Sequence, residues 1–145
     1  MKSMLACMIC LVFILAINVS AEEADAIIGG WYTKDSKALV QIYKSGEVYN
    51  GKIVWLKEPL YEDGTEKRDK NNPDESRHQD KIIGLNLVQG FTYKGKNKWM
   101  DGTIYDPDNG KTYSCKMTLK TDNELKVRGF IGVSLIGRTQ MWQRK

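Results

Sequence analysis

The segment Lys111-Thr112-Tyr113-Ser114-Cys115-Lys116-Met117-Thr118-Leu119-Lys120 alternates apolar and polar side chains along its whole length. Tyr113, Cys115, Met117 and Leu119 fall on one face, and the polar side chains fall on the other. Because successive side chains of a β-strand point to opposite faces, this period of two predicts a strand with one buried side.

The same pattern recurs on both sides of this segment. Residues Glu124 to Phe130 alternate in the same way, and the short link between the two segments predicts a hairpin turn. The other expected strands are Gly30–Thr33, Ala38–Tyr43, Glu47–Leu56, Ile83–Tyr93, Trp99–Tyr105 and Leu135–Arg144. Gly- and Asn-containing turns separate most of them. Eight antiparallel strands joined mainly by hairpins avoid exposed edges most simply by closing, so we expect an all-β, up-and-down eight-stranded barrel.

One long segment does not follow this pattern of strands and short turns. The 25 residues from Lys57 to Lys81 include fourteen charged side chains and two prolines. Within them, Asn72-Pro73-Asp74-Glu75 is typical of a helix start, with Asn72 as the N-cap and proline at the first helical position. We therefore expect a long charged loop with one short helical turn. Such a loop either folds over a barrel mouth or is simply solvated.

The N-terminus differs in composition from the rest of the 145-residue chain. Lys2 is followed by an apolar run from Met4 to Val19, then by small residues and an acidic pair. This pattern predicts a secretory signal peptide over residues 1–21 and one barrel domain over residues 22–145. The apolar run is short for a membrane anchor and continues past the two cysteines that a lipid could modify. We expect the chain to be exported, to the periplasm or beyond the cell, and not to be an integral membrane protein.

Removal of residues 1–21 would leave 124 residues, a net charge of +3 and a single cysteine, Cys115. No internal disulfide is then available, so the stability must come from a packed core. The modest charge, with acidic residues interleaved among the basic ones, argues against a nucleic-acid partner.

The two ends of the expected barrel carry complementary side chains. The first strand opens with Gly29-Gly30-Trp31, and Arg138, Trp142 and Arg144 share one face of the last strand. In a closed barrel these strands are neighbours, so an arginine can stack on the Trp31 ring in a cation–π contact.

These features resemble a known superfamily. The Gly-x-Trp start and Trp-x-Arg end are similar to those of the calycins, which include lipocalins, fatty-acid-binding proteins and avidins. The whole segment after residue 21 looks like a family of small exported bacterial proteins known only as a domain of unknown function. The matching stretches are Gly30-Trp31, Ala38 to Tyr43, Gly51 to Leu56, Asp69 with Asn72-Pro73, Gly84-Leu85, Gly102 to Pro107, Gly110 to Tyr113, Leu125 to Gly129 and Gly137 to Arg144. The resemblance implies a lipocalin-like barrel whose structural closing contact joins Trp31 to Arg144, with Arg138 as the second choice. It implies no reaction and no established ligand.

Catalytic and metal-binding patterns are absent from the sequence. His78 is the one histidine and lies in the charged loop, whereas Cys115 lies on the apolar face of a strand, where cysteine usually acts as a small hydrophobe. The acidic stretches complete no calcium loop, and one histidine with one cysteine argues against a zinc site. We therefore expect a non-enzymatic protein with no cofactor and no metal.

An eight-stranded barrel either fills its interior with side chains or holds one small ligand. Five residues have a strand parity suited to line such an interior: Tyr49, Trp55, Tyr113, Met117 and Trp142. Each could equally be core. The sequence thus favours a carrier of a small, hydrophobic or amphipathic molecule. The alternative is a cell-envelope interaction module that holds a protein or a polysaccharide on its outer surface. Neither an oligomeric state nor the identity of a ligand follows from these patterns.

Overall fold

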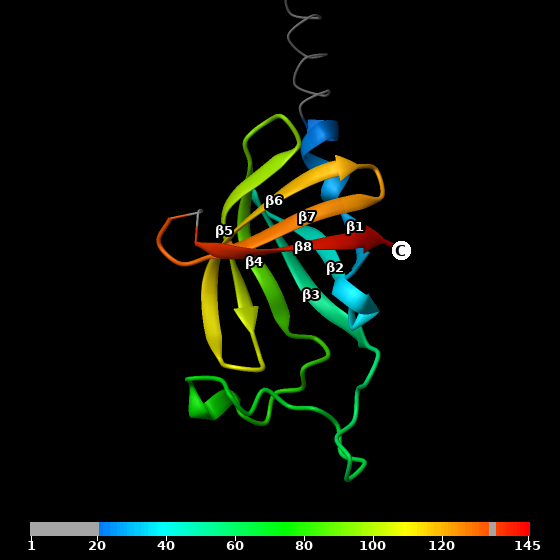
Figure 1. Cartoon of the computed structure of the whole chain (residues 1–145), viewed down its shortest axis with the longest axis vertical. Helices are drawn as coiled ribbons and strands as arrows, with labels where there is room; N and C mark the ends of the chain where they lie inside the picture. Colours follow the sequence, from blue (N-terminus) through cyan, green and yellow to red (C-terminus); the bar gives the residue numbers. More distant parts are fainter. Residues whose placement is uncertain (1–20, 134–135) are drawn as a thin grey trace, which may run out of the picture.

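The computed structural model describes residues 21–133 and 136–145, and these form a closed antiparallel barrel (Figure 1). Each strand pairs with the next in chain order, and the last pairs with the first. The strands are β1 (Gly29–Tyr32), β2 (Ala38–Ser45), β3 (Val48–Leu56), β4 (Asn86–Tyr93), β5 (Lys98–Asp106), β6 (Lys111–Thr121), β7 (Glu124–Phe130) and β8 (Gly137–Arg144). The expected up-and-down eight-stranded barrel is confirmed.

Two strands begin more than one residue later than expected. Strand β4 begins at Asn86 rather than Ile83, because Gly84 turns the chain with a φ of +102°. The Gly84 N–H donates to the Ile53 carbonyl at 2.7 Å, which fixes this turn against β3. Strand β8 begins at Gly137; the expected start at Leu135 lies outside the described residues, as does most of the expected signal peptide.

A 3-10 turn, η1 (Asp25–Ile27), closes one end of the barrel. The indole nitrogens of Trp31 and Trp99 donate to the Ile27 and Ala24 carbonyls at 2.9 and 3.1 Å. The Tyr49 hydroxyl donates to Asp25 at 2.6 Å, and its burial raises the pKa of this phenol. Three buried rings thus hold η1 and the residue before it over the core, so this end of the barrel is sealed.

The opposite end carries four connections, because alternate turns of an up-and-down barrel lie at the same end. They are the β1–β2 link with the 3-10 turn η2 (Lys34–Ser36), the long 57–85 segment with the 3-10 turn η3 (Glu75–Arg77), the β5–β6 turn and the β7–β8 hairpin. In Figure 1 the long segment extends beyond the barrel, away from η1.

The long segment is docked on the β5–β6 turn through a buried carboxylate. Asp69 is fully buried; it accepts hydrogen bonds from the Tyr105 hydroxyl at 2.7 Å and from the Asn72 amide at 2.8 Å. The Asn71 amide donates to two carbonyls of the turn at 3.0 Å each. A Cβ at Gly110, whose φ is +71°, would collide with the Asn71 carbonyl oxygen. Glycine therefore allows the two backbones to approach closely here.

The expected helical turn is present, but its N-cap is Asp74 and not Asn72. The Asp74 carboxylate accepts from the Ser76 N–H at 3.0 Å. Asn72 is used otherwise, since its side-chain oxygen accepts from the Asp74 N–H at 2.9 Å while its amide donates to Asp69. The sequence rule placed the cap at Asn72, but the amide of Asn72 binds Asp69, whose carboxylate is held by the tertiary contact with Tyr105.

Candidate functional site

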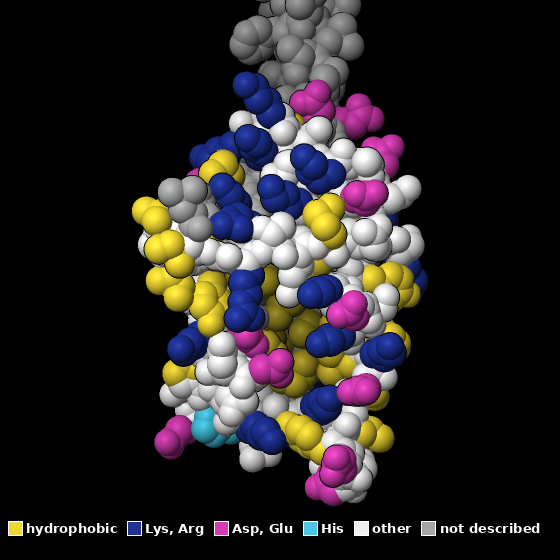
Figure 2. Space-filling model, viewed as in Figure 1, with side chains coloured by type: hydrophobic (Ala, Val, Ile, Leu, Met, Phe, Trp, Pro, Cys, Tyr) yellow, Lys and Arg dark blue, Asp and Glu magenta, His cyan; other side chains and the backbone are white. Residues whose placement is uncertain are grey.

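The barrel is hollow toward its open end. A cavity of about 1310 Å³ extends from the core to the four connections. Pockets that hold drug-sized ligands measure roughly 300–1,000 Å³, so this space is large enough for a small molecule. Figure 2 shows a hollow on one face of the molecule, with hydrophobic side chains in its depth and charged side chains around its edge.

The incomplete seam between the first and last strands helps to open this cavity. Strand β1 pairs with β8 only through Trp31 with Arg144 and Tyr32 with Gln143. The chain then leaves the sheet into η2, so the first half of β8 has no strand partner on this side among the described residues. Arg138 and Gln140 lie in that half, face the cavity and remain exposed.

The deep wall of the cavity is apolar. It is formed by the inward side chains of β3, β4, β5, β7 and β8 and by one residue of the long segment. These are Ile53, Leu87, Ile104, Val127, Trp142 and Ile82. Gly129 on β7 widens this wall, because a Cβ there would lie 3.3 Å from the Ile104 Cγ2 and 3.8 Å from the Tyr113 Cβ.

The mouth is charged and its balance is positive. Seven basic and four acidic side chains line the cavity, most of them on the connections at the open end. The basic ones are Lys34, Lys37, Lys57, Lys67, Arg68, Lys70 and Arg138; the acidic ones are Asp35, Glu58, Asp106 and Asp108. An apolar interior beneath a positive rim suits a molecule with an apolar body and a polar or anionic end.

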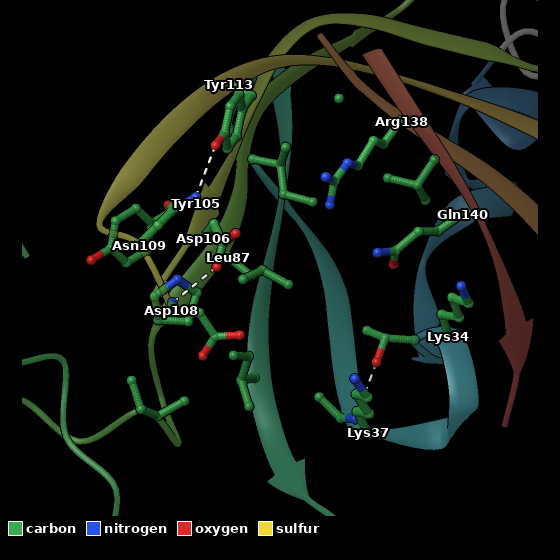
Figure 3. Close-up of a pocket in the computed structure, with 18 of the residues that line it drawn as sticks. Lys34, Lys37, Leu87, Tyr105, Asp106, Asp108, Asn109, Tyr113, Arg138 and Gln140 are labelled. Atoms are coloured by element: carbon green, nitrogen blue, oxygen red, sulfur yellow. Dashed lines mark hydrogen bonds between the residues drawn. The ribbon is translucent and has the colours of Figure 1, made fainter. Parts of the chain in front are cut away.

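The structure brings two of the five expected ligand-binding residues to this cavity. Trp142 lies on its deep wall, and its indole N–H donates to the Gln140 side-chain oxygen at 3.2 Å. Tyr113 lies further out and accepts a hydrogen bond from the Asn109 amide at 2.9 Å (Figure 3).

Two others belong to the sealed end. Tyr49 and Met117 are buried in the main core cluster and do not line this cavity. Both side chains point into the barrel as expected. Their position along the barrel axis, however, places them among packed side chains near η1. Position along the axis depends on the tilt and stagger of all eight strands, which no single strand reveals.

Trp55 is the clear error. Its side chain is 42% exposed and meets Tyr32 edge-on, with ring centroids 6.1 Å apart, and it does not line the cavity. The register between β2 and β3 shifts here: Val40 pairs with Ile53, but Leu39 pairs with Trp55. The extra residue is a β-bulge, which reverses the inward and outward alternation beyond it. Trp55 and Tyr49 therefore do not share a face.

The barrel-closing pair is Trp31 and Arg144. These residues are register partners, and the Arg144 guanidinium carbon lies 4.2 Å from the centre of the fully buried Trp31 ring. The guanidinium also donates to the carbonyls of Ala26, Ile28 and Asp122 at 2.7, 3.1 and 2.6 Å. Arg138, the second choice for this contact, lies in the cavity instead.

The remaining chemically notable residues are placed away from the cavity. Cys115 is buried, and desolvation raises the pKa of its thiol to about 12. His78 lies in the long segment with its Nε2 2.7 Å from the Asn72 carbonyl oxygen. In the described part of the chain, no three His, Cys, Asp or Glu side chains gather as metal ligands would. Nor does any helix in residues 21–133 and 136–145 have the length and apolar character to cross a bilayer.

A second, smaller groove of about 270 Å³ lies on the outer face of β5, β6 and β7. Five basic side chains line it and no acidic one does: Lys98, Lys116, Lys120, Lys126 and Arg128. Lys116 and Arg128 are direct register partners, an arrangement of like charges that destabilises a sheet. This outer basic face is thus electrostatically distinct from the apolar interior.

Sequence reasoning missed several cavity residues, among them Lys34, Lys37 and Gln140. The sequence pattern does indicate Gln140, because this residue lies between Arg138 and Trp142 on the same face of the last strand. Lys34 is the first residue of the η2 turn and Lys37 follows it, and no alternation there indicates which way a side chain points. Their contribution to the mouth follows only from the closed barrel.

The comparisons with known proteins agree with this architecture. Among solved structures, the chain is similar to protein HP1028 from the human pathogen Helicobacter pylori, which belongs to the lipocalin family. The TM-score is 0.72 at 19% sequence identity, and the match covers 82% of each chain. At this identity the likeness establishes the fold alone. No curated protein sequence matches the chain.

A family model matches residues 29–144, which run from the first residue of β1 to the last residue of β8. This range includes both the closing pair and the whole cavity wall. The chain therefore belongs to the bacterial family described as "Uncharacterized protein conserved in bacteria (DUF2147)".

Proposed function

We propose that this protein binds one small, partly apolar molecule in its barrel cavity and catalyses no reaction on it. The observation that carries the proposal is the cavity itself: about 1310 Å³ of space, with an apolar deep wall and an open, charged mouth. Burial of an apolar ligand surface against that wall would drive binding. We propose that this activity lies outside the cytoplasm, in the periplasm or beyond the cell, and the expected signal peptide over residues 1–21 supports this.

The distribution of aromatic side chains supports the cavity over the outer surface as the binding region. Trp31, Trp99, Trp142 and Phe91 are buried, whereas Trp55 is the exposed tryptophan among the described residues. An interaction module that relied on aromatic contacts would place such rings together on its surface.

The outer basic face favours a second candidate, attachment to an anionic component of the cell envelope. Lys98, Lys116, Lys120, Lys126 and Arg128 line the groove on that face, and no acidic side chain lines it. This function would need no cavity, so the two candidates respond to different substitutions.

A cavity-filling substitution tests the first candidate. Gly129→Leu would project a side chain into the cavity beside Ile104, whereas Thr103→Leu adds similar bulk on the exposed, outer side of β5. We expect the apolar fluorophore N-phenyl-1-naphthylamine to bind the wild type and the Thr103 variant, and to lose most of its affinity for the Gly129 variant. Native mass spectrometry of the purified protein would also reveal a retained ligand. Equal binding to all three proteins would place the probe outside the barrel and contradict the proposal.

A further inference from the structure

Arg138 differs from every other arginine of the described chain in having no partner. Arg68 donates to the Gln79 carbonyl, Arg77 pairs with Asp80, and Arg144 donates to three carbonyls. Arg128 donates to Thr139 on the outer face. Within residues 21–133 and 136–145, no hydrogen bond or ion pair of the Arg138 guanidinium is found, and its side chain points into the cavity (Figure 3).

Gln140 adds a second donor group on the same wall. It lies two residues along β8 from Arg138, so both side chains face inward about 7 Å apart. Its side-chain oxygen is occupied by the Trp142 indole N–H at 3.2 Å. That contact orients the amide so that its NH₂ group remains as a donor toward the cavity. Figure 3 shows the Gln140 side chain directed inward below Arg138.

None of the four acidic side chains that line the cavity forms an ion pair with Arg138. Asp106 accepts the Asp108 N–H at 2.9 Å within its own turn, and it takes part in no ion pair. Lys34 and Lys37 add positive charge at the mouth, next to η2 (Figure 3). A guanidinium and an amide NH₂ thus lie beside an apolar wall, under a rim with more basic than acidic side chains, and no described acceptor is hydrogen-bonded to them.

We propose that the cavity selects an amphipathic organic anion, and that Arg138 and Gln140 bind its anionic head. The inference rests on the proposed function and specifies its ligand class. The head is a carboxylate, sulfonate or phosphate, each of which accepts the paired N–H donors of a guanidinium. The apolar body lies against Leu87, Ile104 and Trp142 on the deep wall.

Two fluorophores that share one ring system test this proposal. 8-Anilinonaphthalene-1-sulfonate carries a sulfonate, and N-phenyl-1-naphthylamine is the same molecule without it. We expect the wild type to bind the sulfonate probe more tightly than the neutral one. Arg138→Ala should weaken the sulfonate probe about tenfold or more, the usual effect of losing a charge-assisted hydrogen bond, and leave the neutral probe unchanged.

Arg77→Ala is the matched control, because it removes the same charge from an exposed side chain of the long segment that pairs with Asp80 and does not line the cavity. It should leave both affinities within about twofold of the wild type. Gln140→Glu provides a second, independent variant: a carboxylate beside Arg138 should abolish sulfonate binding and spare the neutral probe. Far-UV circular dichroism and urea midpoints establish that each variant is folded.

The outcomes separate this inference from the proposed function. If the neutral probe binds the wild type but Arg138→Ala and Arg77→Ala weaken the sulfonate probe equally, the attraction is unspecific and the anion site is wrong, while the cavity function stands. If neither Arg138→Ala nor Gln140→Glu changes sulfonate binding, the anion site is likewise overturned. If neither probe binds the wild type, the cavity function itself fails.

Discussion

Replacement of Trp31 by alanine tests whether the contact between the first and last strands stabilises the barrel. The Trp31 side chain is fully buried, its N–H donates to the Ile27 carbonyl at 2.9 Å, and Arg144 stacks on its ring at 4.2 Å. Truncation of a buried tryptophan costs about 3–5 kcal/mol through lost contacts and the remaining cavity. The lost cation–π contact contributes about 0.5–2 kcal/mol, and the Ile27 carbonyl loses its partner.

We therefore expect Trp31→Ala to lower the free energy of unfolding by about 4–5 kcal/mol, in the upper part of the range for buried aromatics. Urea denaturation followed by far-UV circular dichroism measures the change without relying on tryptophan fluorescence. Because small domains are stable by about 5–15 kcal/mol, the milder Trp31→Phe variant should also be measured. It keeps a ring but loses the hydrogen bond.

Trp55→Ala is the matched control for this experiment. It removes the same side chain from the outer surface, where the ring is 42% exposed and meets only Tyr32 among the aromatic rings of the described chain. We expect a loss of about 1 kcal/mol or less, the usual size of one aromatic pair. If Trp31→Ala cost less than about 1 kcal/mol, or no more than Trp55→Ala, the closing contact would not stabilise the fold and the reasoning would be refuted.

Three further predictions concern other parts of the chain. Tyr105→Phe should destabilise the protein by about 1–3 kcal/mol, because buried Asp69 loses one of its two side-chain donors. The pKa of Tyr105 is raised to about 12. The neutral phenol therefore contributes its full stability below pH 10, and this contribution is lost as the pH rises toward 12. Over this interval the urea midpoint should fall less in the Tyr105→Phe variant than in the wild type. Cys115 is buried and the pKa of its thiol is raised to about 12, so a thiol reagent should label it slowly in the native state and quickly in urea. Rapid labelling of the native protein would show that the Cys115 side chain of β6 does not point into the core. Expression of the full chain in an exporting bacterium should yield a protein that begins at Glu22, and an intact mass that retains residues 1–21 would contradict cleavage after Ala21.

The strand pattern was readable from the sequence because it is local. A half-buried strand alternates wherever it lies, and the segment around Cys115 shows this without knowledge of its neighbours. The same parity placed Arg138, Trp142 and Arg144 on one face of the last strand. Since a barrel must bring its end strands together, the contact between Trp31 and an arginine followed as well, although the choice of Arg144 drew on the resemblance to the calycins.

Other properties arise only when the strands are assembled. The bulge that turns Trp55 outward exists in the register of β3 with β2, and not in either strand alone. The burial of Asp69 depends on Tyr105, 36 residues away, and on a glycine that admits the Asn71 backbone. Whether a barrel interior is filled or hollow depends on the side chains of all its strands together with strand tilt and stagger. Sequence thus determined that the chain closes and which residue types face inward. Tertiary structure decided that the interior has room for a ligand and that Arg138 faces it without a partner, because empty space and unmet donors are properties of the whole assembly.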